Sequence, residues 1–356
     1  MSFSYGERFR VTLFGQSHAP SVGVVIDGLP AGIPFDMDAA LAFMARRAPG
    51  GALATARQEA DVPEILSGLV NGHTCGAPIA AVIRNTDARS GDYAGFLDTP
   101  RPSHADYAAF LKHGAFHDVR GGGYFSARLT APLCFAGAIA IQALAARGIA
   151  LGAHLYSVAQ VQDTPFDPVT VSSIDFARVR AHALPVNDET ILPAIQQVIE
   201  DARATQDSVG GIVECAATNL PGGLGDPPFD GVENRLCRVL FAIPALRGVE
   251  FGAGFAAAAM RGSAHNDPFL YENGVVKTHT NHHGGALGGL TSGMPLLFRA
   301  AFKPTPSIGM EQDTVNLATG ENVRLSIMGR HDPCVALRAV PCVEAAAAVA
   351  LLDMML

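Results

Sequence analysis

The chain has 356 residues and a formal net charge of −8, with 16% charged residues, 49% apolar residues and no Trp. This length suits one large domain or two, and it can bury a core without disulfides or a structural metal. The composition excludes a disordered chain, and the negative charge argues against a nucleic-acid binder. The six cysteines form no C-x-x-C pair, so the sequence indicates neither a zinc knuckle nor a redox pair.

No apolar run reaches about 18 residues without Gly, Pro or a charge, so we expect no transmembrane helix. The first residues lack the apolar stretch of a signal peptide. A cytoplasmic protein with reduced thiols is therefore predicted. The basic residues are 22 Arg and 3 Lys. Codon bias explains such an excess, but Arg also makes bidentate contacts to carboxylates and phosphates that Lys cannot make.

Four helices are predicted in chain order. The first is capped by Asp36 and runs to Arg47, where Pro49-Gly50-Gly51 end it. An Ala-rich helix over 132–147, closed by Gly148, is predicted to be deeply buried. Asp188 caps a third helix, and a final apolar helix covers 343–356. Strand-like runs lie between the helices, at 22–26, 79–83, 212–215 and 323–327.

The two halves of the sequence echo each other. The segments at 21–23, 34–36 and 132–135 have counterparts in the same order: Ser208-Val209-Gly210, Pro228-Phe229-Asp230 and Pro295-Leu296-Leu297-Phe298. Chance similarity in a Gly- and Pro-rich chain is the alternative. Because no linker divides the chain by composition, we expect one domain over 1–356 with an internal repeat, about 1–185 and 186–356.

Polar residues are scarce, so four loops in which they gather are candidate site segments: 14–18, 101–107, 120–128 and 329–334. Three consecutive glycines usually mark only a tight turn, but a Gly-rich loop entering a helix can also direct N–H groups at an anion. A second such loop, 284–289, precedes Lys303. Together the loops predict a large anionic ligand, and no Walker-type nucleotide motif is present. The remaining histidines considered are expected to be surface or satisfied core residues: His73, His113, His154 and His182.

These segments resemble chorismate synthase, in that family's order and over nearly the whole chain. The motifs include Gly15-x-Ser17-His18, Arg101-Pro102-x-His104-Ala105-Asp106, Asp118-x-Arg120-Gly121-Gly122-Gly123, Lys303-Pro304-Thr305 and Gly329-Arg330-His331-Asp332-Pro333-Cys334. The resemblance implies an α+β fold, a β-α-β sandwich with an internal pseudo-twofold repeat, assembled as a homotetramer. It implies a lyase of the shikimate pathway, which leads to the aromatic amino acids. Such a lyase uses reduced FMN to remove phosphate from 5-enolpyruvylshikimate 3-phosphate by 1,4-anti elimination, giving chorismate.

The resemblance also implies roles for individual residues. His104 is expected to donate a proton near the departing phosphate, His18 to protonate reduced flavin, and Asp332 to act with the flavin as the base for the ring hydrogen. Substrate contacts are expected from four arginines, Arg47, Arg101, Arg128 and Arg330. FMN contacts are expected from Ser126, Gly288, Lys303, Pro304, Thr305, Ser307, Arg330 and Arg47. No metal is implied, and NADPH is expected only as a reductant of the flavin.

Four positions depart from the family pattern near the expected cofactor. Tyr124-Phe125 stand where relatives place Arg-Ser, Leu53 replaces an Arg associated with NADPH, and Pro306 replaces a Ser. Two other functions are weighed. A non-catalytic flavin- or phosphate-binding paralogue would lose the acid and base residues, which are present here. A small-molecule kinase could use Gly222–Gly225 over phosphates, but the sequence lacks a nucleotide motif.

Overall fold

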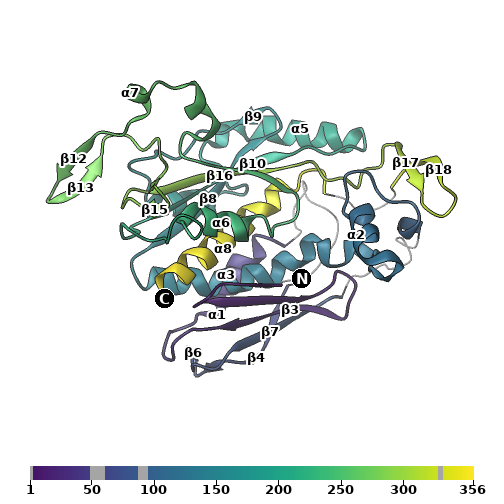
Figure 1. Cartoon of the computed structure of the whole chain (residues 1–356), viewed down its shortest axis with the longest axis horizontal. Coiled ribbons are helices and arrows are strands. Elements are labelled where there is room, and N and C mark those ends of the chain that lie inside the picture. Colours follow the sequence, from purple (N-terminus) through teal and green to yellow (C-terminus); the bar gives the residue numbers. More distant parts are fainter. Residues whose placement is uncertain (1–2, 49–60, 87–94, 328–331) are drawn as a thin grey trace.

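Two five-stranded antiparallel sheets with helices between them form the body of the molecule (Figure 1). The computed structural model describes residues 3–48, 61–86, 95–327 and 332–356. The first sheet has the spatial order β1(Ser4–Tyr5), β2(Arg10–Gly15), β3(Ser21–Asp27), β7(Ile79–Arg84), β4(Pro63–Ser67). The second has the order β11(Leu246–Phe251), β16(Leu296–Phe302), β10(Gly211–Thr218), β8(Ala150–Val158), β9(Val161–Gln162).

Two apolar helices, α3(Thr130–Ala145) and α8(Ala336–Met355), fill the space between the sheets. Helix α3 contacts the first sheet, α8 contacts the second, and the two helices pack against each other. A Cβ placed on Gly137 of α3 would lie 2.2 Å from the Cβ of Ala345 in α8, so this close approach requires glycine. The predicted β-α-β sandwich is confirmed.

The segment Ala127–Ala145 is long and apolar enough to cross a membrane by composition alone, but 83% of its most apolar 18-residue stretch is buried inside the protein. It is the core helix that the sequence predicted. Around it, α1(Met37–Ala45) packs on α3, and α6(Val232–Leu240) packs on α8. Helix α4(Ser173–Ala181) covers the other face of the second sheet, because its Phe176 and Val179 form a separate cluster with Ala216 and Leu297.

The remaining elements lie at the edges of this body. They are α2(Asp106–His113), α5(Leu192–Ala204), α7(Gly262–His265) and four hairpins: β5(Leu69–Val70) with β6(His73–Thr74), β12(Phe269–Glu272) with β13(Val275–Thr278), β14(Ala286–Leu287) with β15(Leu290–Thr291), and β17(Gln312–Asn316) with β18(Glu321–Leu325). In Figure 1 the β12–β13 and β17–β18 hairpins project at opposite ends of the molecule. The strand expected at 323–327 belongs to the second of these exposed hairpins and not to the core.

The order of elements supports the internal repeat. The first half runs β2, β3, α1, β4, β7 and then α3, and the second runs β8, β10, α6, β11, β16 and then α8. The spatial orders also correspond: β2-β3-β7-β4 in one sheet and β8-β10-β16-β11 in the other. Since β8 pairs with β10 in the second sheet, both strands belong to the second half. This correspondence favours a junction between the halves near residue 149 over one near 185. The repeat itself stays a prediction.

Two of the three pairs of similar sequence segments occupy corresponding places in the two halves of the fold. Ser21 begins β3 and Ser208 lies just before β10, while the Asp36 and Asp230 segments lead into α1 and α6. The third echo is wrong, because Pro132 lies in helix α3 whereas Leu296 begins strand β16. The final helix also begins earlier than expected, at Ala336, with Pro341 inside it.

Candidate active site

The triple-glycine loop brings two histidines from different loops together. Gly121 and Gly122 have φ values of +59° and +84°, which favour glycine. A Cβ on Gly121 would lie 2.5 Å from Ser17 Oγ and 2.7 Å from His18 Nε2. A Cβ on Gly122 would lie 3.3 Å from His104 Nε2. Both imidazoles therefore border this loop, and any side chain at Gly121 would displace Ser17 and His18.

His104 is held by a buried ion pair. Its Nδ1 lies 2.6 Å from Asp106 Oδ1, and Asp106 also accepts hydrogen bonds from Arg101 Nε at 2.7 Å and Nη2 at 2.9 Å. Burial alone would raise the pKa of Asp106, but the hydrogen bonds from Arg101 and His104 hold it well below its usual range. Burial lowers the pKa of His104 and outweighs the hydrogen bond to Asp106.

The loop after β16 joins this group. Lys303 Nζ donates to the carbonyl oxygen of Ser103, and Ser307 Oγ accepts a hydrogen bond of 3.3 Å from Arg101. Burial, with the nearby charge of Arg247, lowers the pKa of Lys303. The Oγ1 of Thr305 and the Oγ of Ser17 are buried and have no hydrogen-bond partner within the described residues. Buried hydroxyls without a partner are costly, and a bound polar ligand would satisfy them.

A second group of charges lies behind the glycine loop. Asp61 accepts hydrogen bonds from Arg47 and from Arg128, and all three residues are buried. Arg47 Nε also donates to Thr130 Oγ1 at 2.8 Å, at the start of α3. Asp61 carries one negative charge against two positive charges, so the local balance favours an anion.

Asn85 connects the two groups. Its Oδ1 accepts a hydrogen bond of 2.7 Å from Arg128 Nε, and its Nδ2 donates to the carbonyl oxygens of Gln16 and Ala19, which flank His18. Ser126 accepts from the backbone N–H of Arg128 at 3.2 Å and begins the turn that leads into α3. The His18 loop, the glycine loop and the arginines thus form one connected network.

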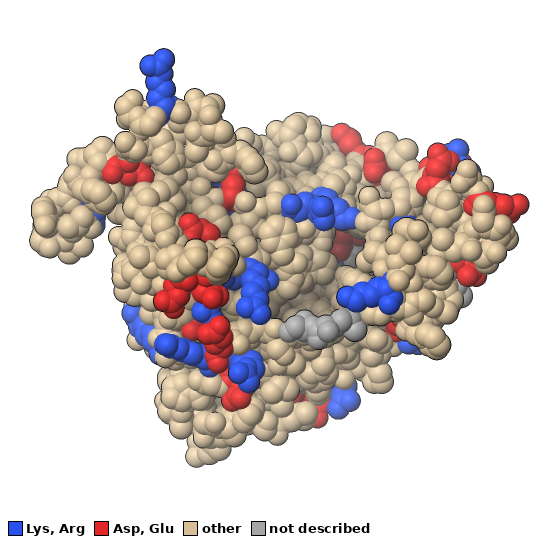
Figure 2. Space-filling view, viewed as in Figure 1, with Lys and Arg blue, Asp and Glu red and all other residues tan. Residues whose placement is uncertain are grey.

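Asp332 lies on the far side of the arginines, just before α8. Its Oδ2 accepts a hydrogen bond of 2.7 Å from Arg338, whose Nε donates to the carbonyl oxygen of Arg47 at 2.9 Å. Arg330 and Leu53 lie outside the described residues. Figure 2 shows that this face of the molecule is hollowed near its middle, with Lys and Arg side chains around the hollow.

Gly288 is the predicted residue that the structure does not bring to this group. It lies in the turn between β14 and β15, and its neighbour Gly289 packs against Gly231 at the start of α6. In Figure 1, β15 lies at the opposite side of the molecule from α2. Within a single chain, Gly288 therefore does not lie beside the two histidines.

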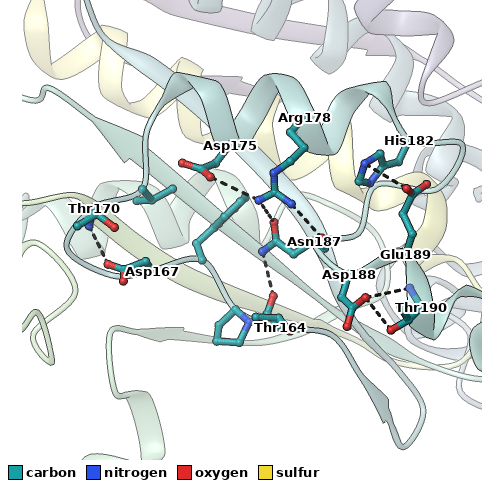
Figure 3. Close-up of a pocket in the computed structure, with 13 residues that line it drawn as sticks. Thr164, Asp167, Thr170, Asp175, Arg178, His182, Asn187, Asp188, Glu189 and Thr190 are labelled. Carbon is teal, nitrogen blue, oxygen red and sulfur yellow. Dashed lines mark hydrogen bonds and ion pairs between the residues drawn. The ribbon is translucent and has the colours of Figure 1, made fainter.

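One cavity adjoins the network and a second is separate from it. One of about 450 Å³ adjoins the His18 loop and is lined by aromatic and polar residues that include Phe14, Gln16, His113, Asp118 and Tyr124. The other, of about 630 Å³, lies beside α4 and is lined by residues from 164 to 190 (Figure 3). None of the predicted site residues lines the second cavity, so it is not part of the candidate active site.

Sequence reasoning gave no role to Asp61, Asn85 or Asp106. Asp106 could have been found, because it lies two residues after His104 in a chain with few charges. Asp61 and Asn85 carry no such signal, since their partners are distant in sequence.

Comparison with known proteins identifies the family of this chain. The family model described as chorismate synthase matches residues 9–356. A chorismate synthase of Korarchaeum cryptofilum is 45% identical over 353 residues, covering 98% of this chain and 96% of that protein. One of Chitinophaga pinensis is 47% identical over 353 residues, covering 99% and 96%.

The fold is found in a solved structure as well. A crystal structure of chorismate synthase superimposes with a TM-score of 0.77 at 24% identity, covering 99% of this chain and 92% of that one. At this identity the superposition supports the fold alone. From the family match and the relatives, the chain belongs to the chorismate synthase family.

Proposed function

We propose that this chain is an active chorismate synthase that removes phosphate and a ring hydrogen from 5-enolpyruvylshikimate 3-phosphate with the aid of reduced FMN. The observation that carries the proposal is the convergence of His18, His104 and an arginine cluster on one glycine loop. The substrate has two carboxylates and a phosphate, so an acidic protein must gather positive charge locally to bind it.

The substrate-binding role of Arg47, Arg101 and Arg128 rests on their charge and position. Each is buried and each contacts a carboxylate, Asp61 or Asp106. These ion pairs hold the guanidinium groups in fixed orientations, so little side-chain entropy is lost when an anion binds. Lys303, tied to the carbonyl oxygen next to His104, would lie near the departing phosphate.

His104 is the proposed proton donor. Its Nδ1 is fixed by Asp106, and its Nε2 borders Gly122 and makes no hydrogen bond within the described residues. An anionic phosphate near Nε2 would favour the protonated imidazole and oppose the effect of burial on its pKa. The proton on Nε2 would then pass to the leaving oxygen.

The residues present fit a flavin mononucleotide. Unpartnered hydroxyls at Ser17 and Thr305, together with Lys303 and Ser307, offer the donors that a phosphate and polar ring edge require. Ser126 and Pro304 belong to the same two loops, and Arg47 donates hydrogen bonds to both Thr130 and Asp61. Reduced FMN supplies transient electron density that assists loss of phosphate. His18 would hold a proton at Nε2 beside Gly121.

Asp332 is the proposed base for the ring hydrogen. Arg338 donates a hydrogen bond to its Oδ2 and so holds the carboxylate in place. Arg330 and Gly288 stay candidate contacts, and Gly288 would have to come from a neighbouring subunit to reach this site. A homotetramer, a cytoplasmic location and flavin reduction by NADPH belong to the same proposal.

The test is phosphate release from 5-enolpyruvylshikimate 3-phosphate under anaerobic conditions, with and without reduced FMN, with absorbance of the product as the second readout. The proposal predicts equimolar phosphate and chorismate only when reduced FMN is present. Flavin binding without phosphate release would identify a non-catalytic paralogue. Turnover without any flavin, or only with a nucleoside triphosphate, would contradict the proposal.

A further inference from the structure

Two cysteines face each other where the central helices cross. The Sγ atoms of Cys134 in α3 and Cys342 in α8 are 3.8 Å apart, and both side chains are buried. About one turn further along each helix, Gly137 meets Ala345 at the closest approach of the two backbones. In each pair the two residues are 208 positions apart in the sequence, so the thiols occupy corresponding places on the two helices.

A disulfide has an S–S bond of about 2.05 Å and needs closely spaced backbones. The gap of 3.8 Å corresponds to two unbonded sulfurs in contact. Rotation about the Cα–Cβ bonds and a small movement of the helices would close it, because the crossing at Gly137 already holds the backbones together.

The two thiols also differ in acidity. The hydrogen bond from Cys134 and the charge of Arg47 lower the pKa of Cys342, although burial opposes them. Burial raises the pKa of Cys134. Because Cys134 Sγ donates to Cys342 Sγ, we assign Cys342 as the thiol that attacks the oxidant and Cys134 as the thiol that resolves the product.

The pair lies directly beneath the candidate active site. Cys342 Sγ donates to the carbonyl oxygen of Arg338 at 3.4 Å, and Arg338 holds Asp332. Thr130, in the first turn of α3, accepts a hydrogen bond from Arg47 Nε at 2.8 Å, about one turn before Cys134. A bond between the sulfurs would remove the first contact and shift both helices that position Arg47 and Asp332.

We propose that Cys134 and Cys342 form a reversible disulfide that links α3 to α8 and lowers the activity of the site above it. The oxidant is a peroxide. The Cys342 thiolate attacks one peroxide oxygen, the O–O bond breaks and water leaves, which gives a sulfenic acid. Cys134 then attacks that sulfur, the S–O bond breaks and a second water leaves. Two thiols are oxidised and one hydrogen peroxide is reduced to two waters. A dithiol reductant restores both thiols.

No C-x-x-C spacing marks this pair of cysteines in the sequence, and no redox pair is expected from the sequence alone. The two cysteines are 208 residues apart, so only the crossing of the helices brings them together.

The experiment treats the full-length protein with hydrogen peroxide, removes the peroxide, alkylates the remaining thiols in denaturant and digests without reduction. The expected result is a cross-linked peptide containing Cys134 and Cys342, with about two fewer alkylated thiols per chain. Dithiothreitol should restore both thiols. Cys134→Ala should stop Cys342 at the sulfenic acid, whereas the control Cys215→Ala, another buried cysteine, should still form the cross-link.

Alkylation of both thiols after treatment, or oxidation of Cys342 without a cross-link in the unmodified chain, would overturn the disulfide. Thermal unfolding provides a second readout that does not depend on the proposed function: the oxidised form should melt at a higher temperature than the reduced form, and Cys134→Ala should lose this difference. Loss of phosphate release on oxidation, reversed by dithiothreitol and absent in Cys134→Ala, tests the regulatory part. Unchanged turnover of a fully cross-linked protein would reject that part while leaving the proposed function intact.

Discussion

Two histidine–carboxylate–arginine networks in this chain are built from the same residue types but in opposite ways. In the candidate active site, His104 contacts Asp106 through Nδ1 alone, and Asp106 pairs with Arg101. In the second sheet, His154 of β8 is bonded at both nitrogens, with Nδ1 2.9 Å from Asp163 and Nε2 2.9 Å from Glu214. Glu214 in turn accepts from Arg299 at 2.9 Å.

The charged neighbours of each imidazole decide the direction of its pKa shift. Burial and the positive charges of Arg101 and Lys303 lower the pKa of His104, and the single carboxylate of Asp106 does not compensate. Burial would lower the pKa of His154 as well, but two carboxylates outweigh it and raise the pKa above its ordinary value. Both nitrogens of His154 are thus bonded to carboxylates, so no nitrogen is left to react. A histidine that keeps one nitrogen next to a ligand loop is suited to chemistry, and one with both nitrogens bonded is suited to stability.

The largest expected effect is on turnover. His104→Ala and His18→Ala should each lower kcat by about 10²–10⁴-fold, the usual contribution of a positioned acid or base, with a smaller change in substrate affinity. Anaerobic steady-state kinetics over neutral pH provide the measurement. A variant with near-normal kcat would remove that histidine from the mechanism.

Removal of the histidine from the second network should lower the stability of the protein. His154→Ala leaves the buried carboxylates of Asp163 and Glu214 without the imidazole that bonds to both, which should cost about 3–5 kcal/mol of unfolding free energy. Denaturant unfolding of the variant and the unmodified chain measures the difference. A cost below about 1 kcal/mol would mean that Arg299 and the backbone N–H groups already compensate the two carboxylates.

Stability should also depend on pH. The pKa of His154 is raised in the folded protein. Its contribution to stability is therefore complete below the pKa of the unfolded chain, about 6.5, and is lost as the pH rises through the pKa of the folded protein. Burial would raise the pKa of Asp163, but the hydrogen bonds from His154 and from the Asn187 backbone N–H lower it. The contribution of Asp163 to stability is therefore present above about pH 4 and is lost at lower pH. The network should stabilise most between about pH 4 and 6.5. Melting temperatures across pH, compared with His154→Ala, check this; parallel curves for the two proteins would contradict it.

The smallest effect concerns Tyr124 and Phe125. Their ring centroids lie 4.1 Å apart with the ring planes tilted by 31°, Tyr124 lines the cavity beside the His18 loop, and neither residue belongs to the buried core cluster. Phe125→Ala should weaken FMN binding by about 0.5–1.5 kcal/mol and leave the flavin-free melting temperature nearly unchanged. Titration with FMN and thermal unfolding with and without it separate the two effects. A large loss of flavin-free stability with unchanged FMN affinity would place the ring in a structural role.

The parts of the fold that local chemistry determines could be predicted. Asp36 caps α1 by accepting from the backbone N–H of Ala39, as its position before an apolar run indicated. Asp188 caps a short 3-10 turn that leads into α5, again as expected. The start of α8 was missed because Pro341 removes one helical hydrogen bond, and burial of the surrounding residues compensates for that loss.

The parts of the site that depend on distant contacts could not be predicted. His18, His104 and the glycine loop were identified as candidates, but their meeting depends on the packing of three loops. The bridge by Asn85 and the shared carboxylate of Asp61 join segments with no common spacing. His154 was expected to be a surface or satisfied core residue, and it is a satisfied core residue. Glu214, a charge within an apolar strand, was the signal for its network.

The most direct measurement of the central claim compares phosphate release by His104→Ala and His154→Ala, with reduced FMN and substrate saturating and with rates expressed per folded molecule. Because His104 has a nitrogen beside the ligand loop and His154 has none, the first variant should lose about 10²-fold or more. The second should keep its turnover within about threefold, since its loss falls on stability. Equal losses per folded molecule in both variants, or a near-normal rate in His104→Ala, would contradict the account.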